Sequence, residues 1–128
     1  ACQEEFKRLG ALVSGTDNHL FLLNTLDSYG INGLEAQKKL RELRIDTRVV
    51  SMPSMERFAL QSPSYQLSVL GKDYSRRIAV EMLTSFGWHK YAKTVMSMDQ
   101  FGASAPAADV IKKFDFTADH LVSMIQAL

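Results

Sequence analysis

Residues 20–53 read LFLLNTLDSYGINGLEAQKKLRELRIDTRVVSMP, and this stretch decides the fold class. It opens with the continuous apolar run 20–23, which is typical of a strand buried on both faces of a sheet. The stretch closes with the β-branched and apolar run 47–52, which Pro53 ends. Between these runs, apolar residues at helical spacing form one helix face, namely Ala36, Leu40 and Leu43. The pattern predicts a strand, a helix and a second parallel strand joined by a right-handed crossover.

Further strands are expected on the C-terminal side of this unit. The short apolar runs 78–80 and 95–98 each predict one. Residues 11–13 have the pattern of an extra strand within a less clearly patterned N-terminal segment, 1–19. We therefore expect one domain over 20–128, an α/β fold arranged as a three-layer α/β/α sandwich with a mostly parallel sheet of about five strands.

Local signals mark where the other helices begin and end. Ser54 can cap a short helical turn, and Ser62 followed by Pro63 is typical of an N-cap with proline at the first helical position. That helix should run to about Leu70 and stop at Gly71. Two helices should close the chain, the second one capped by Thr117. Their apolar faces are Ala107, Val110, Ile111 and Phe114 in one, and Leu121, Val122, Ile125 and Leu128 in the other.

Composition limits the classes of function. The 128 residues weigh 14.4 kDa and carry a net charge of +1, with 46% hydrophobic and 23% charged residues, as in one ordinary globular domain. This charge balance argues against a nucleic-acid or membrane partner, and no apolar run approaches the about 20 residues of a membrane helix. The single cysteine, Cys2, excludes an internal disulfide and a multi-cysteine metal cluster, and it fits a reducing, cytoplasmic compartment.

Most chemical motifs are absent from the sequence. Residues 30–33 hold only two glycines of a phosphate-binding loop and predict an ordinary turn. His19, His89 and His120 have no metal-ligand spacing, so no metal site is expected. The aromatic residues Tyr65, Trp88, Tyr91 and Phe101 are expected to be core and interface residues.

Residues 102–106, GASAP, lie between a predicted strand and a predicted helix. They approach the nucleophile elbow G-x-S-x-G but end in proline, and candidate partners for Ser104 are His120, Asp109 and Asp119. The same segment is also read as a helix start, at which Ser104 accepts from a free N–H. In that reading Gly102, Ala103 and Ser104 form a weak phosphate or sulfate site, the alternative being a capped helix without a ligand.

Several blocks in series resemble the transketolase family. The stretch 48–54, RVVSMPS, matches that family's R-V-V-S-M-P-S, and it is followed at near-family spacing by four more blocks. These are Phe58, Gln61 and Tyr65 to Leu70; AVE at 79–81 with FGWHKY at 86–91; DQFGASAPA at 99–107; and FDFT at 114–117. Together they cover the chain from about Leu20 onward and resemble the C-terminal domain of a transketolase.

The resemblance implies a domain that is not itself catalytic. Transketolases use thiamine diphosphate and a divalent metal to move a two-carbon ketol group between sugar phosphates, and other domains hold both cofactors. The family's G-D-G motif and its catalytic residues lie in those domains, so no catalytic, cofactor-binding or metal-binding role passes to any position of this chain. The expected partners are the catalytic domains of a cytoplasmic, homodimeric parent enzyme.

Two departures from the family keep alternatives open. The family has A-T-G-S-E-V where residues 25–30 read TLDSYG, so only Ser28 agrees and the turn at 26–29 has diverged. The loop after Tyr91 is shorter than in the family and lacks its two glycines. A stand-alone binding or regulatory module with an anion site near Ser104 is one alternative, and a small independent hydrolase is another.

Overall fold

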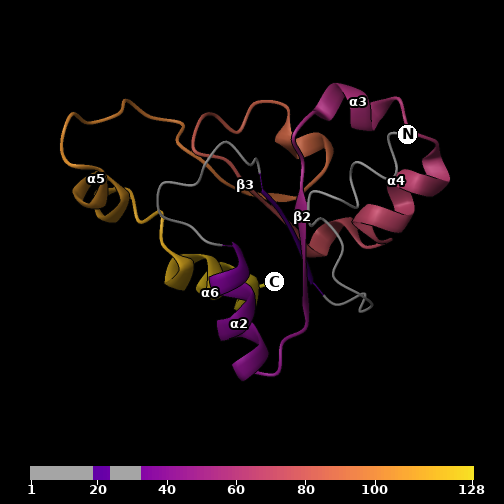
Figure 1. The fold of residues 1–128 in the computed structure, drawn as a ribbon, viewed down its shortest axis with the longest axis horizontal. Helices are drawn as coiled ribbons and strands as arrows, with labels where there is room; N and C mark the ends of the chain where they lie inside the picture. Colours follow the sequence, from indigo (N-terminus) through magenta and orange to yellow (C-terminus); the bar gives the residue numbers. More distant parts are fainter. Residues whose placement is uncertain (1–18, 24–32) are drawn as a thin grey trace.

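A computed structural model gives the fold and describes residues 19–23 and 33–128 (Figure 1). In this part of the chain, strands alternate with helices, as the α/β prediction requires. The elements are β1 (His19–Leu23), α2 (Gly33–Glu42), β2 (Thr47–Ser51), α3 (Met55–Ala59), α4 (Pro63–Leu70), the 3₁₀ turn η1 (Tyr74–Arg76), β3 (Arg77–Val80), the 3₁₀ turn η2 (Trp88–Lys90), β4 (Thr94–Met96), α5 (Ala107–Lys113) and α6 (Ala118–Gln126).

The described strands form one sheet in the order β2-β1-β3-β4, and every neighbouring pair is parallel. The predicted unit of strand, helix and parallel strand is confirmed as β1, α2 and β2. The described part of the sheet has four strands, and the predicted extra strand at 11–13 lies outside the described residues. The last strand is shorter than predicted, since β4 covers 94–96 and the chain leaves the sheet before 97.

Helices cover both faces of the sheet, which confirms the three-layer arrangement (Figure 1). One face carries what we call the α2–α6 core, whose buried members are Ala36, Leu40, Ile78, Val80, Met96, Phe116, Ala118, Leu121, Val122 and Ile125. The other face carries the α3–α4 core of Val50, Met52, Phe58, Leu70, Ala79, Trp88, Tyr91 and Ala92. Alternate residues of β3 enter different cores, as the period of two in a strand requires.

The helix caps predicted at Ser54, Ser62 and Thr117 are confirmed. The hydroxyls of Ser54, Ser62 and Thr117 each accept a hydrogen bond from a backbone N–H in the first turn of the following helix. Pro63 occupies the start of α4, where its missing N–H has no intrahelical partner to lose. Gly71 ends α4 with φ at +70°, a left-handed conformation that residues with a Cβ rarely adopt.

Two leucines predicted on apolar helix faces are exposed, as is Ala107 at the start of α5. Leu43 lies beyond the end of α2 and is half exposed, because the chain reverses there through Arg44, whose φ is +59°. The backbone N–H of Ile45 then donates to the Leu40 carbonyl at 2.9 Å, and Ile45 packs on the α2–α6 core in place of Leu43. Leu128 is likewise exposed, since α6 ends at Gln126.

Two arginines hold the C-terminal end of α4 against the sheet. Arg48 of β2 and Arg77 of β3 both lie beside Leu20 of the central strand, in one row across the sheet. The Arg48 Nη1 donates to the carbonyls of Ser68 and Val69, at 3.0 and 3.1 Å, and the Arg77 Nη2 donates to the Gly71 carbonyl at 2.7 Å. Positive charge at these carbonyls stabilises a helix end that has no basic residue of its own in its last turn.

None of the helices in the described ranges combines the length and the hydropathy that crossing a membrane requires.

Candidate functional site

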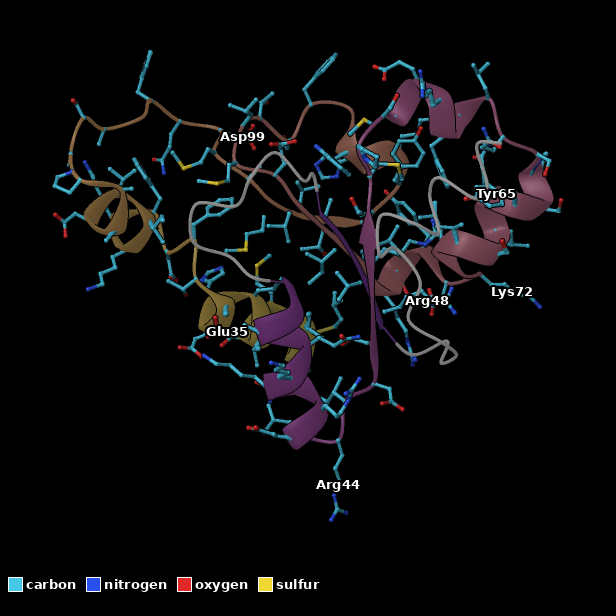
Figure 2. All side chains as sticks on the ribbon, in the orientation of Figure 1. Glu35, Arg44, Arg48, Tyr65, Lys72 and Asp99 are labelled. Atoms are coloured by element: carbon cyan, nitrogen blue, oxygen red, sulfur yellow. The ribbon has the colours of Figure 1, made fainter. Side chains whose placement is uncertain are left out.

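The carboxyl edge of the sheet carries the two longest loops within residues 33–128. One loop follows β3 and the other follows β4, and parallel strands end at the same edge. The backbone N–H of Met98 donates to the Leu83 carbonyl at 2.7 Å, so the two loops lie side by side beyond the strands. Figure 2 shows Asp99 of the second loop at the opposite end of the molecule from Arg44, which follows α2.

Asp99 fastens the two loops to each other. One of its carboxylate oxygens accepts from the Thr84 hydroxyl and from the Ser85 backbone N–H, both at 2.8 Å. The other oxygen accepts from the Ser97 hydroxyl at 2.7 Å. Hydrogen bonds to the carboxylate lower the pKa of Asp99 well below its ordinary value. The bond from Ser97 has the largest effect, followed by those from Ser85 and Thr84. The carboxylate is therefore ionised and committed to holding the loops.

The buried carboxylate of Glu81 anchors the loop that follows β3 through two hydrogen bonds. One oxygen accepts from the Leu83 N–H at 3.1 Å and the other from the indole Nε1 of Trp88 at 3.2 Å. Trp88 is only 2% exposed and begins η2 directly after Gly87, whose φ of +83° turns the chain inward. Burying a carboxylate is costly unless it accepts hydrogen bonds. Here the donors are groups of the chain itself, the Leu83 N–H and the Trp88 indole.

Large apolar side chains stand exposed on these same loops. Leu83 is 66% exposed, Phe86 is 88% exposed and Phe101 is 99% exposed, while Met82 is 41% exposed. We call these four residues the carboxyl-edge patch. All four lie within two residues of Asp99 or of its partners Thr84 and Ser85, and hydrogen bonds hold these three residues together. Large exposed apolar residues on two joined loops mark an interaction surface more often than a chemical site.

The predicted anion site lies on the second loop, close to this patch. Gly102 and Ser104 are exposed and Ala103 is half-buried. The prediction that Ser104 caps the next helix is wrong, because the N-cap of α5 is Pro106, which has no side-chain cap. The Pro106 carbonyl accepts from two N–H groups of the first turn instead. Anion binding by Gly102, Ala103 and Ser104 stays a prediction, and the short helix α5 adds nothing to it.

Two of the three candidate partners for a nucleophilic Ser104, His120 and Asp119, are engaged elsewhere. The Nδ1 atom of His120 pairs with Asp115, an acid that the sequence did not single out, in a short contact. Asp119 pairs with Lys39 of α2 at 2.7 Å, which ties α6 to α2 and raises the pKa of Lys39. Neither contact supports a serine hydrolase, and within the described residues no group of three or more potential metal ligands comes together.

The aromatic predictions divide between core and surface. Trp88 and Tyr91 are buried in the α3–α4 core and Tyr65 packs beside it, as expected of core residues. Phe101, grouped with them in the sequence, is exposed on the loop instead. The exposed Phe86 was missed altogether, although its position next to a loop glycine and two polar residues is a signal that it lies outside a strand or helix.

Replacing Asp99 by asparagine should weaken the loop junction in a pH-dependent manner. The folded pKa of Asp99 is depressed, so its stabilising effect is complete above the ordinary value of about 3.9 and is lost as the pH falls below it. Thermal unfolding from pH 7 to pH 2 should show Asp99→Asn melting below the unchanged protein at neutral pH. The difference should shrink below about pH 4.

The control for this experiment is Asp46→Asn, which removes a carboxylate from the turn before β2. A melting difference for Asp99→Asn that stayed constant from pH 7 to pH 2 would contradict the role given to the ionised carboxylate.

The chain matches one family profile and several proteins of known identity. The family profile described as "Transketolase-like TK C-terminal domain" matches residues 32–117. A transketolase of Bacillus subtilis is 45% identical over 98 residues, covering 74% of this chain and 15% of the relative. A Staphylococcus aureus transketolase is 37% identical over 130 aligned positions, covering 98% of this chain and 20% of the relative.

Solved structures agree with the sequence relatives. The transketolase from Leishmania mexicana superposes with a TM-score of 0.77 at 34% identity, over 91% of this chain and 17% of that chain. A Pichia stipitis transketolase in complex with sedoheptulose 7-phosphate gives a TM-score of 0.77 at 29% identity, with the same coverage. The chain thus spans about a fifth of the length of the relatives it matches, or less.

Proposed function

Because the chain belongs to the transketolase C-terminal domain family, we propose that it is the non-catalytic structural and interaction domain of a transketolase. The observation that carries this proposal is the asymmetry of coverage: 98% of the chain aligns with only 20% of a transketolase. The profile that matches is moreover that of the C-terminal domain. On this proposal, the catalytic residues lie in the remaining four fifths of such an enzyme.

The intact enzyme would transfer a two-carbon ketol group between sugar phosphates. Related Pichia stipitis transketolases have been solved in complex with sedoheptulose 7-phosphate, xylulose 5-phosphate and fructose 6-phosphate, which supports this substrate class. Thiamine diphosphate and a divalent metal would be held by the other domains of a cytoplasmic homodimer. This domain would contribute packing surface and stability to that assembly.

The carboxyl edge of the sheet supports a structural role on chemical grounds. Ligands of parallel α/β folds bind at this edge through polar groups that are free to contact them. Here the carboxylate of Asp99 accepts from three donors of the chain itself, and that of Glu81 accepts from Trp88 and Leu83. Carboxylates occupied in this way position loops and are poorly suited to exchange protons with a substrate.

The test compares the isolated chain with a full-length chimera. The isolated chain, supplied with thiamine diphosphate, magnesium, xylulose 5-phosphate and an aldose phosphate, should show no turnover and no shift in melting temperature. The chimera is the Staphylococcus aureus transketolase with its aligned stretch replaced by this chain, and it should be active. Turnover by the isolated chain, or an inactive chimera whose grafted part unfolds independently, would overturn the proposal.

A further inference from the structure

The carboxyl-edge patch rests on a rigid base. Beyond the strands, Glu81 donates its N–H to the Met96 carbonyl at 2.9 Å, and Met98 donates to the Leu83 carbonyl. The Asp99 carboxylate adds the bonds to Thr84 and Ser85 within two residues of both phenylalanines. A surface held in place before binding loses little conformational entropy when a partner covers it.

The chemistry of the patch favours a protein surface as its occupant. Residues 82–87 and 98–106 contain two phenylalanines, a leucine and two methionines, and Asp99 is their single charged residue. Lysine and arginine, which would be needed to bind an anionic membrane or a nucleic acid, are absent from both loops. Aromatic residues and methionine are enriched, and charged residues depleted, at the centres of protein–protein interfaces.

The amino and carboxyl edges of the sheet, where the parallel strands begin and end, differ in the chemistry of their exposed side chains. At the amino edge, charged residues surround the exposed Leu43. Arg41 and Glu42 end α2, and Arg44 and Asp46 lie in the turn between α2 and β2. The loops at the carboxyl edge carry the exposed rings of Phe86 and Phe101 instead. Figure 2 labels Asp99 at this end of the molecule and Arg44 at the other. The carboxyl edge is therefore the face built to be covered.

We propose that the carboxyl-edge patch is the surface through which this domain docks on the catalytic domains of a transketolase. This inference rests on the proposed function and names the residues that carry out the interaction. The relatives supply the occupant, since about four fifths of their length lies outside the part that this chain matches. Phe86 and Phe101 act as the anchors, and Met82 and Leu83 fill the area between the loops and the partner.

Hydrogen–deuterium exchange on the isolated chain and on the chimera tests the location of the interface. Peptides that cover 82–87 and 98–102 should exchange at least about tenfold more slowly in the chimera, because docking buries the loops. A peptide over 41–46, at the opposite edge, should exchange equally in both. Protection at 41–46 without protection of the two loops would overturn the proposed surface.

A double variant, Phe86→Ser with Phe101→Ser, tests the two anchors. In the isolated chain it should leave the melting temperature nearly unchanged, since both rings are almost fully exposed. In the chimera it should abolish the loop protection and make the grafted domain melt separately, at the temperature of the isolated chain. The matched control is Leu43→Ser, which also replaces an exposed apolar residue by serine and should leave the chimera as it was.

The outcomes separate this inference from the proposed function. If the chimera is active and its loops stay protected in the double variant, the proposed docking surface is wrong and the proposed structural role stands. If the chimera is inactive and its grafted part unfolds independently, the structural role itself is wrong. Sedimentation of the isolated chain should give a monomer. A stable dimer that the double variant dissociates would mean that a second copy occupies the patch, and it would overturn the choice of partner.

Discussion

Trp88→Ala should lower the free energy of unfolding by about 3–5 kcal/mol, the usual cost of removing a buried aromatic side chain. The indole is 2% exposed and packs in the α3–α4 core beside Ala79 and Tyr91. Its removal leaves a cavity between the sheet and η2, and it also takes a donor away from the buried carboxylate of Glu81. The loop that carries Leu83 and Phe86 should loosen at the same time.

The matched variant for this experiment is Trp88→Phe. It keeps much of the ring volume and loses the N–H donor, so its cost should be smaller, about 1–3 kcal/mol. Urea unfolding followed by far-ultraviolet circular dichroism gives both values, since Trp88 is the chain's only tryptophan and fluorescence is lost in both variants. Equal costs for the two substitutions would mean that the hydrogen bond, and not the cavity, accounts for the effect.

Leu121→Ala should lower the free energy of unfolding by about 2–5 kcal/mol through the other core. Leu121 has no exposed surface and joins α6 to α2 and β3, together with Ala36, Leu40 and Ile78. Neighbouring backbone is fixed by the sheet and by the Thr117 cap, so the cavity can close only in part. The same urea titrations measure the loss as a lower midpoint with an unchanged slope.

Leu43→Ala is the control for this leucine. Leu43 is half exposed at the turn after α2, and its truncation should change stability by no more than about 0.5 kcal/mol. If Leu43→Ala cost as much as Leu121→Ala, Leu43 and not Ile45 would be the residue that completes the α2–α6 core.

Local signals predicted most of the architecture. Ser62 with Pro63, Gly71 and Thr117 mark the helix ends correctly, because capping depends on residues within one turn of each other. The misassignment of Leu43 has a clear cause. The end of α2 depends on the left-handed conformation of Arg44, and an arginine gives no signal of it, as a glycine would have done.

The interaction surface could not be predicted in the same way. Phenylalanine is usually buried, so neither Phe86 nor Phe101 indicates from sequence alone that it stands in solvent. Their exposure follows from how the Asp99 carboxylate joins two loops that are more than ten residues apart in the chain. The Glu81–Trp88 contact is likewise a product of the turn at Gly87, and the resemblance to the family marks these residues without giving their roles.

The order of strands in the sheet has a consequence for how the nascent domain folds. β1 lies in the centre, between β2 and β3, yet α3 and α4 intervene before β3 is synthesised. Until then one backbone edge of β1 has no partner, and an open strand edge invites pairing between chains. Pairing across such long loops is also slow. A ribosome that pauses after β2 therefore holds this domain with one edge of its central strand open, and chaperone binding is expected in that interval.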